Sequence, residues 1–519
     1  SYSLLIKIIN NQFYHQSINI MNYKNLGIFM IILFGFVLNV ISMQIVGSSF
    51  RHLQGALNVE IDQISYMMSA YLMAEVVIIP FSGWLSRLIS IRLLFLCGLS
   101  GFLLASIGCA FTNNFYLMVA FRAMQGFTGG ALMPLMFSCI YLLFDKKQIP
   151  IILAITATIG VSSIAFGPAI GGWMTEMLSW RWMFLYNIPV ALVLLTLGYF
   201  FLDLRDREPK LLKQIDFSGI ILLAASLLLL LITLEEGAEL DWFASYIIRF
   251  SSILCIITFF LFFYRELTAD NPIIDLKIFN NRNFSIGCIN VVVFGVLIYV
   301  PIFMLPVFLG EVRGIGPWEI GAMVSVMGLA WMATGPFVSI LLNFLGGRAL
   351  ILIGCILIFI GTWWMVNITS EFGFDELFWP QVLRGVGSQL LWVGNQYIAM
   401  YFVPRIGIQN AASMFNLILR LGGAVSIAVT NIFLEKMQII YYGNISNAIN
   451  MGSEILSGTS QKIEGLFQNF PILPNFTPNF KALLAAEILG QREGFIMAIN
   501  NITFFIMWFA IIPIVLLPL

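Results

Sequence analysis

Long apolar runs separated by short polar segments occupy the chain from about residue 26 to its last residue. A bilayer core of about 30 Å requires roughly 20 helical residues per crossing. Fourteen runs meet this requirement: 26–48, 63–85, 91–112, 115–141, 151–174, 182–202, 217–234, 245–264, 283–309, 318–342, 349–367, 377–402, 408–434 and 494–519. The pattern predicts an all-α polytopic membrane protein, and the even number of crossings places both termini on one side.

The composition supports this prediction and narrows the possible functions. Of 519 residues, 60% are apolar and 10% are charged, whereas a soluble domain carries about 25% charged residues. The net charge is zero, so no charge asymmetry favours nucleic acid as a partner. We find no Gly-x-Ser-x-Gly, His-Glu-x-x-His or phosphate loop, and histidine is nearly absent. We therefore expect no enzyme, catalytic residue, metal site or cofactor.

The distribution of basic residues predicts the orientation. With a cytoplasmic N-terminus, the inner segments hold fifteen Lys and Arg residues and the short outer loops hold four. Cytoplasmic loops of membrane proteins carry this excess. We therefore expect a multi-pass protein of a bacterial inner membrane with both termini in the cytoplasm. Residues 1–25, which lack the pattern of a signal peptide, are expected to form a cytoplasmic tail.

Two stretches of the chain repeat at an offset of eight spans. Arg122, Gln125 and Gly126 in span four correspond to Arg384 and its following glycines in span twelve. Such weak internal symmetry is typical of transporters. We predict six-helix bundles at 26–202 and 283–519, joined by residues 203–282, which hold a cytoplasmic linker and two inserted spans. The range 435–493 is predicted to be a long periplasmic loop.

Three local patterns suggest helices that move or pack closely. The hairpin from Gly83 to Arg92 carries Arg87 and Arg92, which are interpreted either as partners for helix ends or as ordinary positive-inside charge. Arg122 lies within a span, where a charge is costly unless it is paired. Span five contains Gly167-Pro168-x-x-Gly171-Gly172, in which the glycines permit close helix contact and the proline bends the helix.

In this order and spacing, these stretches resemble the major facilitator superfamily. The Gly83–Arg92 hairpin, Arg122-x-x-Gln125-Gly126 and Gly167-Pro168-x-x-Gly171-Gly172 are similar to its loop, span-four and antiporter motifs. The sequence Trp180–Pro189 and the insertion of two spans resemble the fourteen-span drug:proton antiporters of the EmrB/QacA type. The resemblance extends from about residue 26 to the end. It implies proton-coupled efflux of drugs or other amphipathic small molecules by alternating access.

The chain departs from this family at two acidic positions within the spans. Span one usually carries an aspartate where this chain has Asn39, and span fourteen often has Asn-Asp where it has Asn500-Asn501. Amides do not titrate, so these two possible proton carriers of the family cannot carry a proton in this chain. The hairpin also has Ser86 where an acid is usual.

Glu75 is the carboxylate nearest the middle of any predicted span. An ionisable residue at this depth is by default a candidate functional group. We predict that it carries the coupled proton and that Arg122, about 7 Å away along the membrane normal, stabilises its charged form. The alternative is a fixed ion pair that holds two helices together.

Polar residues near the midplane are candidates for the substrate path between the halves. They are Asn39, Gln44, Gln125, Asn395 and Gln396. Each could equally form a hydrogen bond between helices, worth roughly 0.6 kcal/mol. The sequence predicts neither the substrate nor the direction of transport.

Other functions remain open at this level. One alternative is an exporter or importer of a native metabolite, such as a siderophore, without the usual proton coupling. Another is a receptor or scaffold that transports nothing. The resemblance also implies a periplasmic adaptor protein as a partner for some relatives, with the range 435–493 either as its docking site or as a plain loop.

Overall fold

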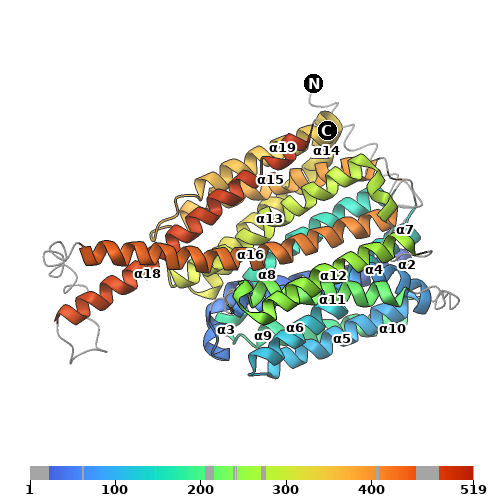
Figure 1. Ribbon diagram of the computed structural model, residues 1–519. Helices are drawn as coiled ribbons and strands as arrows, with labels where there is room; N and C mark the ends of the chain where they lie inside the picture. Colours follow the sequence, from blue (N-terminus) through green and yellow to red (C-terminus); the bar gives the residue numbers. More distant parts are fainter. Residues whose placement is uncertain are drawn as a thin grey trace.

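The computed structural model describes residues 23–60, 63–145, 148–204, 216–237, 240, 242–269, 276–401, 403, 408–451 and 478–517. Within these residues the regular structure consists of α- and 3-10 helices, as the apolar pattern predicted. Figure 1 shows long helices packed side by side into one elongated bundle. The all-α prediction is confirmed for the described residues.

The described residues from 23 to 204 form nine α-helices. They are α2 (Tyr23–Gln44), α3 (Phe50–Leu57), α4 (Tyr66–Ile89), α5 (Ile91–Phe111), α6 (Phe115–Gly130), α7 (Leu132–Leu143), α8 (Ile149–Met177), α9 (Trp182–Leu185) and α10 (Asn187–Phe201). The 3-10 turns η1 (Gly47–Ser49) and η2 (Gln63–Ser65) lie between the first of them. These helices cover the first six predicted spans, with α6 and α7 sharing span four.

The rest of the chain begins with the two inserted spans. These are α11 (Phe217–Glu235) and α12 (Tyr246–Thr268), with η4 (Trp242–Ala244) between them and η5 (Leu276–Asn280) after them. The remaining helices are α13 (Arg282–Glu311), α14 (Pro317–Trp364), α15 (Phe374–Tyr401), α16 (Ile408–Met451), α18 (Pro478–Phe509) and α19 (Ile512–Leu516).

Helix α14 holds two predicted spans that meet at Gly346. The backbone there has φ 78° and ψ 165°, which is not helical. A glycine adopts this left-handed φ without steric cost, so the chain turns sharply between 318–342 and 349–367. In the described residues, eleven helices are long and apolar enough to cross a membrane. The other three predicted spans coincide with α4, α8 and α15.

Polar side chains start several of these helices. Asn114 accepts a hydrogen bond from the Leu117 amide at the start of α6, and Asn281 accepts from the Phe284 amide at the start of α13. An N-cap of this kind satisfies a backbone donor that has no partner within the helix. The polar breaks in the sequence therefore also set where the crossings begin.

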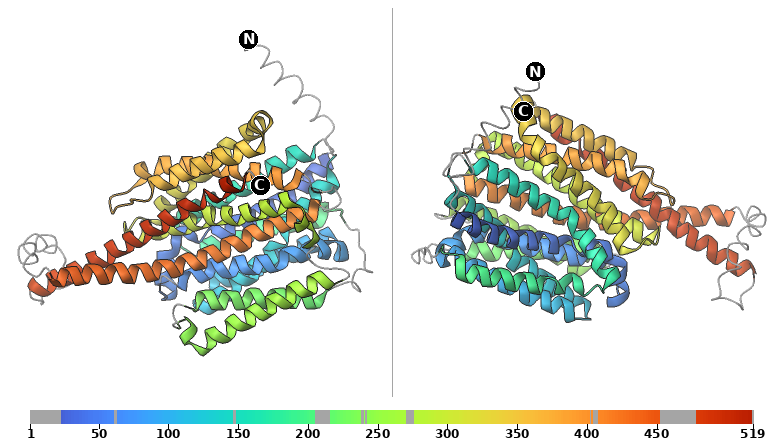
Figure 2. Two further views of the ribbon diagram at one scale, coloured as in Figure 1. Left: turned by 45° about the horizontal axis from the view of Figure 1, so that its top comes forward. Right: turned by 180° about the vertical axis from the view of Figure 1, so that it is seen from behind.

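The prediction that 435–493 is a long loop is wrong for its described residues. Helix α16 runs on to Met451 and α18 starts at Pro478, so both helices extend into this range. Figures 1 and 2 show the two helices projecting together beyond one end of the bundle. Apolar residues continue past residue 434, and Tyr442 donates a hydrogen bond to Glu487 at 3.4 Å across the pair.

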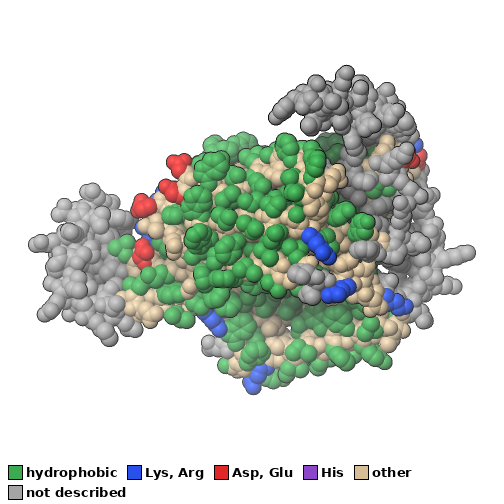
Figure 3. Space-filling view, turned by 90° about the horizontal axis from the view of Figure 1, so that it is seen from above, with side chains coloured by type: hydrophobic (Ala, Val, Ile, Leu, Met, Phe, Trp, Pro, Cys, Tyr) green, Lys and Arg blue, Asp and Glu red, His purple; other side chains and the backbone are tan. Residues whose placement is uncertain are grey.

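The outside of the bundle is apolar. Figure 3 shows hydrophobic side chains over much of one face, with acidic side chains gathered at one edge. Helices α11 and α12 pack against each other at the periphery, and their exposed side chains include Phe217, Ile221, Ile256 and Phe260. A surface of this kind is matched to lipid rather than to water.

Candidate functional site

Arg122 on α6 connects three helices of the first half. The guanidinium is fully buried and donates to the backbone carbonyl oxygens of Met67 at 3.3 Å, Ser42 at 2.8 Å and Met43 at 3.0 Å. It also donates to Gln125 Oε1 at 2.8 Å. The charge is thereby held by α2, α4 and its own helix, which satisfies a planar group with several donors.

The predicted pairing of Glu75 with Arg122 is not what the structure has. Glu75 Oε2 lies 3.6 Å from Nε of Arg420, which comes from α16. Helices α4 and α6 are neighbours, as the prediction required. The Arg122 guanidinium, however, lies over the Tyr71 ring at 4.4 Å and is directed to backbone oxygens.

The second oxygen of Glu75 is held by Asn39. Asn39 Nδ2 donates to Glu75 Oε1 at 3.1 Å, and the Tyr71 hydroxyl donates to Asn39 Oδ1 at 2.5 Å. Glu75, Asn39 and Tyr71 are all buried. The carboxylate of span two therefore lies beside the residue of span one at which the resemblance expects an aspartate.

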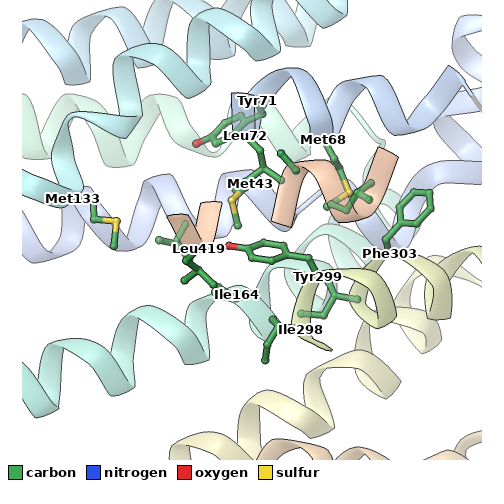
Figure 4. Close-up of a cluster of buried hydrophobic side chains, with 14 of the residues drawn as sticks. Met43, Met68, Tyr71, Leu72, Met133, Ile164, Ile298, Tyr299, Phe303 and Leu419 are labelled. Carbon is green, nitrogen blue, oxygen red and sulfur yellow. The ribbon is translucent and has the colours of Figure 1, made fainter. Parts of the chain in front are cut away.

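Arg420 contacts residues of two helices that are distant in the sequence, α2 and α13. Its Nη1 donates to the Tyr299 hydroxyl at 2.8 Å and contacts Met43 Sδ at 2.8 Å, while Nε makes no hydrogen bond in the described structure. Figure 4 shows Met43, Tyr71 and Tyr299 within one cluster of buried hydrophobic side chains. Only 3% of the Arg420 side chain is exposed, so the ion pair lies in an environment of low polarity.

Arg384 on α15 has surroundings that correspond to those of Arg122. It donates to Gln381 Oε1 at 3.0 Å, one helical turn away, and to the Leu297 carbonyl oxygen on α13 at 3.2 Å. Arg122 likewise bonds a glutamine on its own helix and carbonyls on the first long helix of its half. The similarity of the two sites agrees with the repeat that the sequence indicates.

The glycine–proline sequence of α8 packs against α2. A Cβ on Gly171 would collide with the Ile45 carbonyl oxygen, and one on Gly167 would lie 2.8 Å from Gln44 Cβ. Ser48 donates to the Pro168 carbonyl oxygen at 2.6 Å. The two backbones approach this closely only because the side chains are absent.

The same helix contacts α14 of the other half. A Cβ on Gly172 would collide with the Pro317 carbonyl oxygen, and Gly321 on α14 lies against the Pro168 carbonyl. Nearby, Glu176 accepts a hydrogen bond from the Trp318 amide at 3.1 Å. Gly167, Pro168, Gly171 and Gly172 therefore lie between α2 on one side and α14 on the other.

A further contact joins the halves at the same end. Arg51 Nη1 donates to the Gly310 carbonyl oxygen at the end of α13, at 3.1 Å. This is the end of the bundle that the charge distribution predicts to be periplasmic.

Gly126 on α6 also allows a close approach of two helices. A Cβ on Gly126 would collide with the Tyr71 carbonyl oxygen on α4.

Only part of the Gly83–Arg92 hairpin can be described. Gly83 and Arg87 lie within α4, and the surroundings of both residues fall outside what the structure describes. Arg92 donates to the Tyr199 carbonyl oxygen at 2.5 Å and lies 5.1 Å from the centre of the Tyr199 ring. It therefore binds the end of α10, in its own half.

The other path candidates separate into two groups. Gln44 is completely buried, and neither atom of its amide has a hydrogen-bond partner in the described structure. Asn395 donates to the Gly287 carbonyl at 3.0 Å and accepts from Asn290 at 3.4 Å, while Gln396 beside it is half-buried. The Gln44 amide is thus buried without a hydrogen-bond partner in the described structure, whereas Asn395 joins two helices.

Sequence reasoning did not identify Arg420 as a site residue. A signal was present, because Arg420 is a charged residue within span thirteen and Glu75 needs a cation. The sequence predicts Arg122 as the partner of Glu75 because the two residues have similar depths in the membrane. No spacing in the sequence relates Glu75 on α4 to Arg420 on α16. Among the described residues, no group of three or more His, Cys, Asp or Glu could hold a metal ion.

The family is decided by comparison with known proteins. The model of the Major Facilitator Superfamily matches residues 32–427. The chain belongs to this superfamily. Its members are transporters, so this is a multi-pass membrane transporter of small molecules.

Its relatives are resistance and export proteins. The chain is 30% identical to the colistin resistance protein EmrB of Acinetobacter baumannii over 442 residues, which cover 85% of this chain and 86% of that protein. It is 27% identical to the multidrug export protein EmrB of Escherichia coli K12 over 478 residues, covering 90% and 92%. The predicted resemblance to EmrB-type transporters of the Major Facilitator Superfamily is confirmed.

Solved transporters of the superfamily share the fold. A bacterial homolog of the human lysosomal transporter Spinster superposes with a TM-score of 0.58 at 12% identity, over 95% of this chain and 97% of that one. A D-xylose–proton symporter gives 0.57 at 12% identity, over 79% and 90%.

Proposed function

We propose that this protein exports drugs or other amphipathic small molecules by alternating access, driven by protons that bind to Glu75. The names of its EmrB relatives support the substrate class. The observation that carries the proposal is the ion pair between Glu75 on α4 and Arg420 on α16, at 3.6 Å. It joins the two proposed halves near the middle of the membrane.

The position of Glu75 supports its role as the proton carrier. Asn39 cannot titrate, but its amide lies within hydrogen-bond distance of the Glu75 carboxylate. Glu75 of span two thus places its carboxylate close to position 39 of span one, where the family resemblance expects an aspartate. A proton on Glu75 would remove its attraction for Arg420, which keeps its hydrogen bond to Tyr299.

This exchange would couple proton entry to movement of the halves. While Glu75 is charged, the attraction between the two buried charges holds α4 against α16. When it is protonated, the contact between the halves is weakened at this depth and the bundle can reopen on the other side. In this proposal Arg122 and Arg384 hold helices together within each half, and the glycines of α8 allow the halves to move.

Transport into inverted membrane vesicles tests the proposal. The substrate is chosen from a growth-inhibition panel of toxic amphipathic compounds, with the gene deleted and overexpressed. We expect uptake that needs a pH gradient and is abolished by a protonophore. Glu75→Gln is expected to lose this uptake but to keep downhill exchange, whereas Glu319→Gln, at an exposed acid, keeps both. Retained gradient-driven uptake by Glu75→Gln would overturn the role of Glu75.

We further propose that the protein lies in a bacterial inner membrane with both termini in the cytoplasm. The excess of basic residues in alternate loops supports this orientation. Cysteines placed at Lys24 and at the exposed Glu371, in a Cys97→Ser background, are labelled with an impermeant maleimide on spheroplasts. We expect labelling only at position 371, and labelling only at position 24 would reverse the orientation.

The hairpin of α16 and α18 is the proposed docking site for a periplasmic adaptor. Its exposed apolar side chains include Ile439, Ile440, Ile488 and Leu489, which are 42–63% accessible. The test replaces residues 442–490 with a short Gly-Ser turn. We expect normal transport in vesicles and lost resistance in whole cells. Unchanged resistance in cells would exclude this docking site.

A further inference from the structure

Several buried polar groups beyond residue 282 have no hydrogen-bond partner in the described structure, and four of them lie on α13, α14 and α15 close to one set of aromatic rings. These four are the carbonyl oxygens of Asn290 and Gln389 and the indole N–H groups of Trp331 and Trp392. Each side chain is at most 5% exposed. A buried polar group without a partner has lost its hydrogen bonds to water and has gained none in the protein. A ligand that forms hydrogen bonds with these four groups would therefore be bound favourably.

The same helices bring aromatic rings together beside these groups. The Phe294 ring is stacked on Trp392 at 5.2 Å and meets Trp331 edge-on at 5.9 Å. Trp392 also contacts the Phe415 ring at 5.6 Å. These rings come from α13, α14, α15 and α16, so four helices of one half converge on a single aromatic cluster.

Helical spacing places the polar groups on the faces that carry the rings. Asn290 precedes Phe294 by four residues on α13, and Gln389 precedes Trp392 by three on α15. The amide nitrogen of Asn290 donates to Asn395, which in turn donates to the Gly287 carbonyl. The Asn290 side chain is thus anchored through its nitrogen, while its oxygen is left for another donor.

The cluster lies next to the ion pair along two helices. Phe294 and Tyr299 are five residues apart on α13, and Phe415 and Arg420 are five apart on α16. At 1.5 Å per residue this is about 7.5 Å. In the proposed orientation the cluster lies on the cytoplasmic side of the ion pair, so a compound that leaves the cell would reach it first.

We propose that these residues form a binding subsite for an uncharged, planar heteroaromatic ring that carries both hydrogen-bond donors and acceptors. Indole N–H groups would donate to its carbonyl oxygens, and the oxygens of Asn290 and Gln389 would accept from its N–H. Stacking on Trp392 and Phe294 would hold the ring plane. None of these side chains is charged, which favours a neutral ring over a cation or an anion. The inference rests on the proposed export function, for which this would be a substrate subsite.

Binding of lumiflavin to the purified full-length protein in lipid nanodiscs tests the subsite. Lumiflavin is a neutral, planar tricyclic ring whose imide N–H lies between two carbonyls, and its fluorescence is quenched by stacking on tryptophan. The N3-methyl derivative has the same ring but lacks that donor. We expect saturable quenching by the protein, with the methyl derivative bound about tenfold more weakly, since one buried hydrogen bond is lost.

Two variants locate the binding, and a third serves as control. Trp392→Phe keeps a ring but loses the indole donor, and Gln389→Met keeps the volume but loses the acceptor. Each is expected to weaken lumiflavin binding about tenfold, and Gln389→Met should also remove the preference over the methyl derivative. Trp364→Phe, at a side chain that is 56% exposed, should bind as the unaltered protein does.

The outcome is independent of proton coupling. Glu75→Gln should bind lumiflavin normally, because the test uses no gradient. Absence of saturable quenching would overturn the subsite while leaving the export proposal intact. So would binding by Trp392→Phe and Gln389→Met that is as tight as binding by the unaltered protein. Normal binding together with failed vesicle transport would overturn the export proposal and keep the subsite.

Discussion

Glu75 on α4 and Arg420 on α16 form a buried ion pair, with Oε2 and Nε 3.6 Å apart. The two residues belong to spans two and thirteen, and their side chains are 0% and 3% exposed. Each charge is therefore compensated mainly by a residue that is far away in the sequence. Because Glu75 Oε2 and Arg420 Nε make no hydrogen bond, the pair is held by charge alone at these atoms.

Removing one partner of this pair should destabilise the protein more than removing both. Arg420→Met leaves a buried carboxylate without a counter-charge and is expected to cost about 3–5 kcal/mol. Glu75→Gln combined with Arg420→Met should recover most of this loss. Thermal unfolding in detergent measures both effects. Additive losses in the double variant would show that the two side chains do not interact.

Moving the carboxylate from position 75 to position 39 should preserve proton coupling. Asn39→Asp combined with Glu75→Gln keeps one carboxylate and one amide within hydrogen-bond distance of each other. The Tyr71 hydroxyl still finds an oxygen at position 39. We expect the double variant to regain the gradient-driven uptake that Glu75→Gln loses. If the double variant stays uncoupled, position 39 does not substitute for position 75.

Arg122 should require its guanidinium geometry and not only its charge. Three of its nitrogens donate to carbonyls on two helices, which an ammonium group cannot reproduce. Each hydrogen bond to a charged group contributes about 1.5–3 kcal/mol. Arg122→Lys is therefore expected to lower the unfolding temperature nearly as much as Arg122→Met. Arg249→Lys, at an exposed position, is the control, and a stable Arg122→Lys protein would contradict this interpretation.

A methyl group on Gly172 should obstruct the contact between α8 and α14. Its Cβ would collide with the Pro317 carbonyl oxygen, which is backbone and cannot rotate away. Overpacking of this kind costs about 1–3 kcal/mol. Gly172→Ala is expected to lower both vesicle uptake and thermal stability. Gly27→Ala, where no atom lies within 4 Å of an added Cβ, should leave both unchanged.

Asp216 should stabilise the first inserted helix in a pH-dependent way. Burial raises the pKa of its carboxyl, but hydrogen bonds from Ser218, the Gly219 amide and Arg265 outweigh this and hold the pKa below its ordinary value of 3.8. A lowered pKa stabilises the folded state above the unfolded pKa, and this contribution is lost as the pH falls through the folded pKa.

The measurement is amide hydrogen exchange of residues 217–235. Asp216→Ala removes the N-cap and should cost about 0.5–2 kcal/mol of local stability at pH 7. Asp216→Asn keeps a capping oxygen and loses the charge, so its difference from the unaltered protein should shrink as the pH drops below about 4. A difference that is constant from pH 7 to pH 3 would exclude a role for the Asp216 charge.

The hairpin of α16 and α18 is a part of the fold that the sequence did not predict. Beyond residue 434 the charges and prolines of 435–493 indicated a loop, yet Tyr442 packs against Gly490 and Gly494 of the returning helix. The apolar part of each helix reaches only part of the way into this range, to Ile445 on α16 and from Glu487 on α18. Mutual packing outside the bundle stabilises both, and such packing is not readable from either segment alone.

The sequence by itself determined the positions of the long apolar helices, the all-α fold of the described residues and the family resemblance, because apolar length, caps and glycine spacing act locally along each helix. It also indicated that Glu75 is a candidate functional residue, because burying a carboxylate within a membrane span costs free energy whichever helices surround it. Only the tertiary structure decided that its partner is Arg420 and that Asn39 lies against its other oxygen. Those contacts depend on how α4, α2 and α16 pack together, and helix packing brings together residues that no spacing in the chain relates.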